Sequence, residues 1–138
     1  MKRIRAIALL AIANFAVAGM SFAQSYGVKA DVPFDFTVAN KLLPAGTYTM
    51  IRESTGLVEI RNHDKPIAVL TIVNQDVNKS PDGGKLIFHK YGDQYFLSEI
   101  LSDWATINVT VPRSKAETRV RLQQAMVQPA SEVFIATR

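Results

Sequence analysis

Cysteine is absent from all 138 residues of the sequence. This absence excludes disulfides, thiol nucleophiles and cysteine-ligated zinc sites, and it also excludes a lipid-modified N-terminal cysteine. A folded domain made from this chain must therefore gain its stability from burial of a core, without covalent cross-links.

Histidine is also scarce, since only His63 and His89 occur. Neither has another histidine or a cysteine at the spacing of a zinc motif, and no Gly-x-Ser-x-Gly segment marks a nucleophile. His63 falls in a polar turn and is expected to be exposed, whereas His89 lies on a strand and is expected to face solvent or a partner strand. The sequence therefore assigns no catalytic residue and no cofactor. A hydrolase would require one of these histidines to lie within about 3 Å of a carboxylate.

The N-terminal segment has the order of a secretory signal peptide. A positive head at residues 2–5 precedes the apolar run 6–20, and Ser21-Phe22-Ala23 then supplies small residues before Gln24. The apolar run is 15 residues long, shorter than the roughly 20 that span a membrane. We therefore expect residues 1–23 to be removed after Ala23, leaving a protein of the periplasm or cell exterior with no membrane span.

The positive charge of the chain belongs largely to that segment. The formal net charge is +4, and three of the sixteen basic residues lie within residues 1–23. The remaining residues carry 13 Lys and Arg against 12 Asp and Glu, so their net charge is +1. No basic run remains, and a nucleic-acid partner is not expected.

Residues 28–38 alternate between apolar and polar side chains. Val28, Val32 and Phe36 belong to the apolar series, and this period predicts a strand with one buried face. Pro33 lacks the amide that a ladder hydrogen bond needs. The strand is therefore expected to lie at a sheet edge or to break at that residue.

Two later segments give strong strand predictions of different kinds. The run 67–73 is apolar on both faces, which is typical of a central strand covered on both sides. Residues 85–91 and 94–101 flank Gly92-Asp93, which predicts a hairpin with a type II′ turn. Shorter strand-like runs lie at 47–51, 57–61 and 106–111, and a turn is expected at Asn40-Lys41.

The C-terminal part changes character. Ser114 and Glu117 fit a capping box in which each side chain bonds the other's amide, and Glu117 and Arg121 form a weak helical pair. A helix is predicted from Ser114 to about Met126, followed at 133–135 by a last strand or a docking tail.

The fold class expected is all-β, a small antiparallel sandwich or barrel of about seven strands with a C-terminal helix. The expected division is a signal peptide at 1–23, a β domain at 24–113 and a helix and tail at 114–138.

Two segments carry a family resemblance. The sequence VPFDFTV at 32–38 with LPAGTY at 43–48, and YGDQYFL at 91–97, resemble segments of small exported proteins of unknown function from environmental Gram-negative bacteria. The resemblance implies export, but it implies no activity and transfers no site residue.

Aromatic residues supply the candidate binding site. Tyr91, Tyr95 and Trp104 cluster around the predicted hairpin and the loop after it. Such side chains stack on sugars or form the centre of a protein interface. The alternative is that they are cross-strand core pairs.

The candidate metal site is a polar loop. Asp76, Asn78, Ser80 and Asp82 place oxygen at positions 1, 3, 5 and 7, as in a calcium loop. Pro81 stands where a glycine is required, and Ile87 stands where a bidentate glutamate is required. An ordinary polar loop between strands is the alternative explanation.

Three functions are compatible with these patterns. The first is a non-catalytic exported binding or interaction module of the cell envelope. Its partner would be a protein or a glycan, held by the loops at one end or by the strand edge at 28–38. The second is an envelope or extracellular hydrolase using His63 or His89. The third is a structural protein that self-assembles through edge strands.

Overall fold

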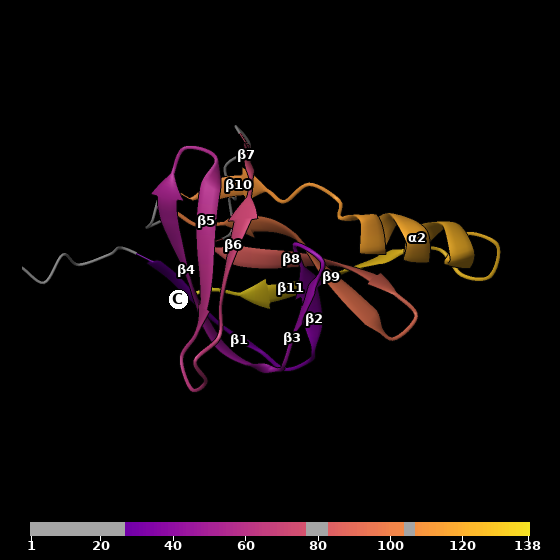
Figure 1. Cartoon of the computed structure of the whole chain (residues 1–138), viewed down its shortest axis with the longest axis horizontal. Coiled ribbons are helices and arrows are strands. Elements are labelled where there is room, and N and C mark those ends of the chain that lie inside the picture. The colour runs from indigo at the N-terminus through magenta and orange to yellow at the C-terminus, as the bar shows by residue number, and fades with distance from the viewer. Residues whose placement is uncertain (1–26, 77–82, 104–106) are drawn as a thin grey trace, which may run out of the picture.

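The computed structural model describes residues 27–76, 83–103 and 107–138. The expected signal peptide, residues 1–23, lies outside these ranges. The described residues form eleven strands in two sheets and one helix near the C-terminal end (Figure 1). None of the described helices is long and apolar enough to cross a membrane.

The first sheet has four antiparallel strands. Their spatial order is β1 (Gly27–Val32), β4 (Gly46–Ser54), β5 (Leu57–Asn62) and β6 (Ala68–Ile72). β1 ends directly before Pro33 and lies at the edge of the sheet, so both expectations for this proline are confirmed.

The second sheet has seven strands. Five lie in the order β11 (Ser131–Ala136), β8 (Lys85–Tyr91), β9 (Gln94–Leu101), β10 (Asn108–Thr110) and β7 (Asn74–Gln75). The short hairpin of β2 (Phe36–Val38) and β3 (Lys41–Leu43) joins them through β9. The helix α2 (Lys115–Gln124) lies beside the β8–β9 hairpin at one end of the molecule (Figure 1).

The predicted fold class is confirmed, with more and shorter strands than the seven expected. The segment at 133–135 lies within β11, so the choice between strand and tail is decided in favour of a strand. The β8–β9 hairpin turns at Gly92-Asp93, and Gly92 has the positive φ of 60° that a type II′ turn needs at its first position. The turn expected at Asn40-Lys41 lies one residue earlier. Ala39 and Asn40 both have positive φ there, as a type I′ turn requires.

The run 67–73 was predicted as a central strand, and that prediction is wrong. β6 occupies the edge of the first sheet, and among the described strands only β5 pairs with it. Val69 and Thr71 are buried, whereas Leu70 is 57% exposed and Ile72 is 70% exposed. The sequence shows that both faces are apolar, but the sheet covers only one of them.

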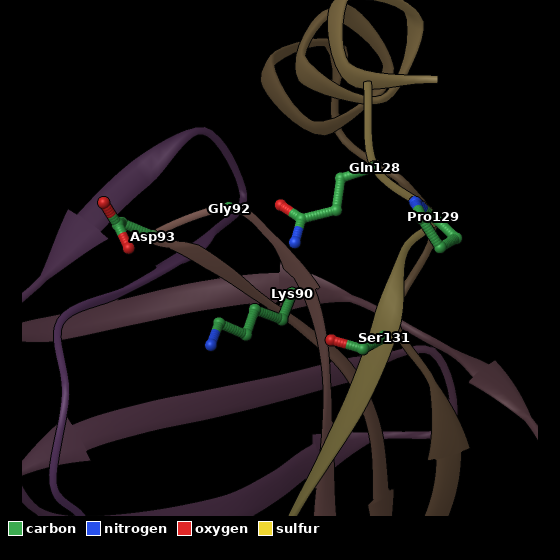
Figure 2. Close-up of a pocket in the computed structure, with 6 residues that line it drawn as sticks. All are labelled: Lys90, Gly92, Asp93, Gln128, Pro129 and Ser131. Atoms are coloured by element: carbon green, nitrogen blue, oxygen red, sulfur yellow. The ribbon is translucent and has the colours of Figure 1, made fainter. Parts of the chain in front are cut away.

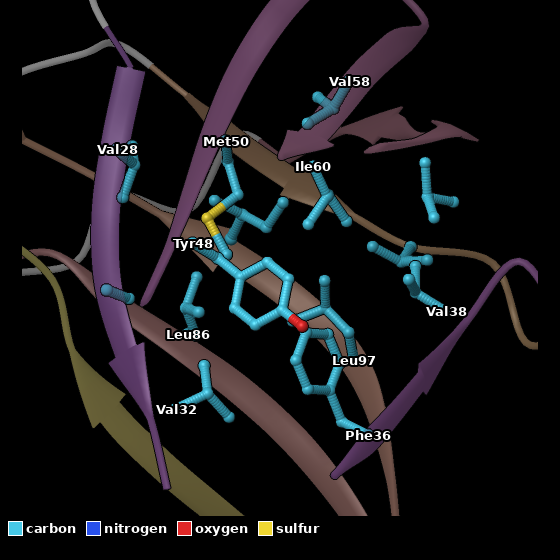
Figure 3. Packing of buried hydrophobic residues seen from close by; sticks show 14 of the residues in the cluster. Val28, Val32, Phe36, Val38, Tyr48, Met50, Val58, Ile60, Leu86 and Leu97 are labelled. Atoms are coloured by element: carbon cyan, nitrogen blue, oxygen red, sulfur yellow. The ribbon is translucent and has the colours of Figure 1, made fainter. Parts of the chain in front are cut away.

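The core lies between the inner faces of the two sheets. Figure 3 shows Tyr48 from β4 in its middle, with Met50, Leu86 and Phe36 around it. The Tyr48 ring is fully buried, and its hydroxyl donates a hydrogen bond to the Pro44 carbonyl at 2.6 Å. A buried tyrosine hydroxyl needs such a partner, so this bond lets a large aromatic ring fill the centre of the core.

The two sheets also meet at one edge. The amide of Lys29 in β1 donates to the Arg138 carbonyl at 3.1 Å, and the Arg138 amide donates back to the Lys29 carbonyl at 2.9 Å. The Arg138 guanidinium also pairs with Asp31. The β1 edge is therefore partly occupied by the C-terminal residue, which closes one side of a half-barrel.

Adjacent leucines in β3 test whether the core carries the stability. Leu43 is fully buried and Leu42 is 66% exposed. We expect Leu43→Ala to lower the free energy of unfolding by about 2–5 kcal/mol, because it removes buried methyl groups and leaves a cavity. Leu42→Ala should change it by less than about 0.5 kcal/mol. Urea denaturation measures both, and equal losses would contradict the core assignment.

Candidate functional site

A buried polar cluster lies between the outer face of the second sheet and α2. His89 lies on β8 next to Phe88, whose ring is fully buried in the core. Successive strand residues point to opposite faces, so His89 points to the helix side. Its Nδ1 lies 2.6 Å from Oε1 of Glu117, and the two side chains are 18% and 4% exposed. One of the two histidines therefore meets the carboxylate that a hydrolase would require.

The other ring nitrogen of His89 contacts a serine. Nε2 lies 3.1 Å from the Ser98 hydroxyl oxygen on β9. Ile87 pairs with Glu99 while Phe88 pairs with Leu97, so Ser98 is the extra residue of a β-bulge. A bulge re-aims a side chain that a regular ladder would direct elsewhere. In this hairpin it brings the Ser98 hydroxyl to His89.

The Glu117 carboxylate makes two further contacts. The buried Tyr91 hydroxyl donates to Oε1 at 3.1 Å, and Arg113 Nε lies 3.7 Å from the same oxygen. Burial raises the pKa of Tyr91, and the neighbouring charge of Glu117 raises it further. The carboxylate thus joins the helix to two side chains of β8.

These contacts revise the expected capping box. The Ser114 hydroxyl accepts from the Glu117 amide at 3.1 Å, so this half of the box is confirmed. The Glu117 carboxylate turns to His89 and Tyr91 and is not paired with the Ser114 amide. Glu117 is the one buried residue of α2. The helix is therefore attached mainly through a polar residue and has no apolar stripe.

The order Ser98, His89, Glu117 is that of a nucleophile, a general base and an orienting acid. With the proton of a neutral His89 on Nδ1, the ring donates to Glu117 and accepts from the Ser98 hydroxyl. Ser98 is only 5% exposed, however. A substrate therefore has little access to this hydroxyl in the described arrangement.

A pocket of about 450 Å³ opens near this cluster (Figure 2). It is lined by Lys90, Gly92, Asp93, Gln128, Pro129 and Ser131. The lining combines charged and polar side chains with Gly92 and Pro129, and neither Ser98 nor His89 belongs to it. The pocket and the buried cluster are therefore separate features of the same end of the molecule.

The residues of the predicted aromatic site have different environments in the structure. Tyr91 is 3% exposed and bonded to Glu117, so its ring is not open to a ligand. Tyr95 is half-buried and stacks on Phe34 with ring centroids 3.9 Å apart, and Lys90 lies over its ring. Trp104 lies outside the described residues. Tyr91 and Phe96 form a ring pair across β8 and β9, as in the alternative explanation, whereas Phe34, which stacks on Tyr95, lies between β1 and β2.

The predicted metal loop lies largely outside the described part of the chain. Asn78, Ser80 and Asp82 fall in the gap at 77–82, and Asp76 alone is described, with its Oδ2 3.5 Å from the Thr110 hydroxyl. Within the described ranges no three metal-binding side chains gather. His63 is exposed beside Asp64, as its turn position predicted.

A second surface lies at the outer edge of β6. The amide of Asn62 donates to the Ile67 carbonyl, and the amide of Val73 donates to the Gly56 carbonyl. Residues 67, 69, 71 and 73 therefore direct their backbone groups to β5, because hydrogen-bonding direction alternates along a strand. Ala68, Leu70 and Ile72 direct theirs outward. No strand of the described residues pairs with that side.

Comparison of the chain with family models, curated proteins and solved structures gives no match. The assignment of function therefore depends on the geometry of these surfaces.

The role of Glu117 is testable by removing it. We expect Glu117→Ala to lower the free energy of unfolding by about 1–3 kcal/mol, because it leaves the buried polar groups of His89 and Tyr91 without a partner. Gln123→Ala, at an exposed position of the same helix, is the matched control and should be nearly neutral. Urea denaturation with helical circular dichroism measures both, and an equal response would show that Glu117 does not hold the helix.

Alkaline pH tests the burial of Tyr91. Its folded pKa is raised above the ordinary value of 10.0, so the folded state holds the phenol proton more tightly than the unfolded state. The corresponding stability is present below pH 10 and is lost as the pH rises through the folded pKa. Tyr48, whose pKa burial also raises, adds to the same loss. Urea denaturation between pH 8 and 11 should show a shallower decline for Tyr91→Phe than for the wild type. Identical slopes would contradict the assignment.

Proposed function

We propose that this protein is an exported, non-catalytic binding module of the cell envelope that takes up an extended segment at the outer edge of β6. The export part is supported by the sequence of residues 1–23. The binding part is supported by one observation, the combination of an edge that no strand of the described residues pairs with and exposed apolar side chains on β6. An extended segment adds to such an edge by main-chain hydrogen bonds, and side-chain contacts give selectivity.

The composition of β6 distinguishes it from the other edges. Strands that pair on one side only usually carry charges or proline, which discourage the addition of another strand. Among the described strands of three or more residues with one partner, β1 carries Lys29 and Asp31, β3 carries Lys41 and β11 carries Glu132. β6 contains Ala68-Val69-Leu70-Thr71-Ile72 and carries neither a charge nor a proline.

The edge at 28–38 is less suitable than the sequence suggested. Both backbone groups of Lys29 are bonded to Arg138, so an incoming segment would have to displace the C-terminal residue. On β6, no described residue bonds the outward backbone groups of Ala68 and Leu70, and the Ile72 carbonyl accepts only the Thr71 hydroxyl at 3.3 Å.

A pocket supports the choice of β6. It has a volume of about 320 Å³ beside the strand and is lined by Ala39, Asn40, Leu70, Thr71, Ile72, Pro112 and Ser114. None of these side chains is charged. The edge therefore borders a neutral, partly apolar hollow that can receive the side chains of an added strand.

A hydrolase is the second candidate, and the Ser98–His89–Glu117 order specifically favours it. Its nucleophile would be the Ser98 hydroxyl, with His89 as the base. The burial of Ser98 favours a structural role for the three residues, and binding at β6 is for that reason the function proposed first.

The binding proposal is tested with a fluorescent seven-residue peptide of alternating valine and threonine. Ala68→Pro removes an outward amide without touching the bonds to β5, and we expect it to weaken peptide binding by about tenfold. Leu42→Lys, at an exposed position on β3, should bind as the wild type does. Fluorescence anisotropy measures the dissociation constants, and the absence of binding at millimolar peptide to protein that sediments as a monomer would refute the proposal.

A fluorophosphonate probe distinguishes the two candidates. The binding proposal predicts that Ser98 remains unlabelled in the folded protein, as judged by intact mass. Labelling that disappears in Ser98→Ala would establish an activated serine and replace the binding module with the hydrolase.

A further inference from the structure

Resting on the proposed binding function, we infer that the segment taken up by β6 is β6 of a second copy of this chain. The two strands pair antiparallel about a two-fold axis at Leu70. The partner is thus the same surface, as the symmetry of a two-fold dimer requires.

The backbone of β6 fits this pairing. Ala68, Leu70 and Ile72 are the residues whose amides and carbonyls point away from β5. A register that sets Leu70 opposite its own copy also sets Ala68 opposite Ile72 on each side of the axis. All three outward residues then fall in hydrogen-bonded pairs, which supply up to about six backbone bonds.

The side chains fit the same register. Leu70 is 57% exposed and Ile72 is 70% exposed, on the sheet face away from the core. In the dimer the two Leu70 side chains lie side by side at the axis, and the small Ala68 faces the larger Ile72. Such cross-strand apolar contacts stabilise antiparallel pairs.

Charges on the neighbouring strand do not oppose the contact. Glu59 and Arg61 of β5 are the register partners of Leu70 and Ala68. Their side chains are already joined by an ion pair of 2.8 Å. A second copy that approaches β6 therefore meets an ion pair on the neighbouring strand, and not two separate charges.

Dimerisation also changes the position of β6 in its sheet. Its apolar residues on both faces are typical of a strand inside a sheet, yet β6 is an edge strand in the single chain. Pairing of two copies makes each β6 an interior strand of one continuous sheet. The strand of the second copy then shields Leu70 and Ile72 from the side, while the outer face of the sheet stays open.

The test uses opposite charges at the axis. The wild-type chain should sediment as a dimer, and Leu70→Lys and Leu70→Glu should each be monomeric, because like charges face one another at the axis. Each variant should raise the dimer dissociation constant by about a hundredfold. An equimolar mixture of the two variants should form a heterodimer, because the introduced lysine then faces the introduced glutamate. Leu42→Lys is the control and should remain dimeric. Since Leu70 is exposed, circular dichroism should show that all these variants fold.

The outcomes separate this inference from the proposed function. A wild-type chain that is monomeric at every concentration, or a dimer that Leu70→Lys leaves intact, overturns the two-fold pairing of β6. If the alternating peptide still binds in that case, the binding module stands and its partner is another protein. If the peptide also fails to bind, both proposals fall. If the wild type dimerises but the mixture of the two Leu70 variants stays monomeric, the register that sets Leu70 opposite its own copy is wrong.

Discussion

The packing of two sheets face to face is the interaction on which the rest of this structure depends. No disulfide supports it, so the buried side chains between the sheets must supply the stability. Tyr48 occupies the centre of this layer, where its hydroxyl remains bonded to the Pro44 carbonyl. Once the inner face is fixed, the period of two along each strand fixes the outer face as well. The side chain of His89 therefore lies on the outer face of β8, and that of Leu70 lies on the outer face of β6.

Local sequence signals predicted local structure well. The alternation at 28–38, the stop at Pro33, the Gly92-Asp93 turn and the Ser114 cap all appear where their chemistry requires them. The position of β6 was missed because its pattern shows which residues are apolar, whereas its place in the sheet depends on whether another strand lies beyond it. That neighbour is a long-range property, and within one chain it is absent from the described residues.

The polar cluster was harder to foresee for the same reason. Glu117 is 28 residues from His89, and the first-turn position of the glutamate was fully explained by capping. Ser98 reaches His89 because β9 has a bulge at this point. No residue type in the hairpin predicts that bulge. The alternation of His89 with Tyr91 on β8 was a usable signal, since it places two polar groups on one face that needs a cover. The aromatic site was interpreted from composition alone, and the burial of Tyr91 depends on where α2 lies.

The two surfaces of interest are connected through the start of α2. Ser114 caps the helix and also lines the hollow beside β6. Asn40, from the β2–β3 turn, lines the same hollow and accepts a hydrogen bond from the Ala116 amide at 3.1 Å. The contacts that hold the first turn of the helix therefore also set one wall of the β6 edge. The Glu117 cluster and that wall are therefore connected by the first turn of the helix.

The paired bonds between Lys29 and Arg138 have a consequence for the order of folding. They join backbone groups about a hundred residues apart in the sequence, whereas the β4–β5, β5–β6 and β8–β9 pairs join neighbouring segments. Closing so long a loop costs chain entropy before any contact repays it, so contacts of this kind form slowly. The hairpins are expected to assemble first, and the half-barrel closes along β1 last. Until that closure, β1 is an open edge in a partly folded chain, and its Lys29 and Asp31 then discourage pairing with the wrong strand.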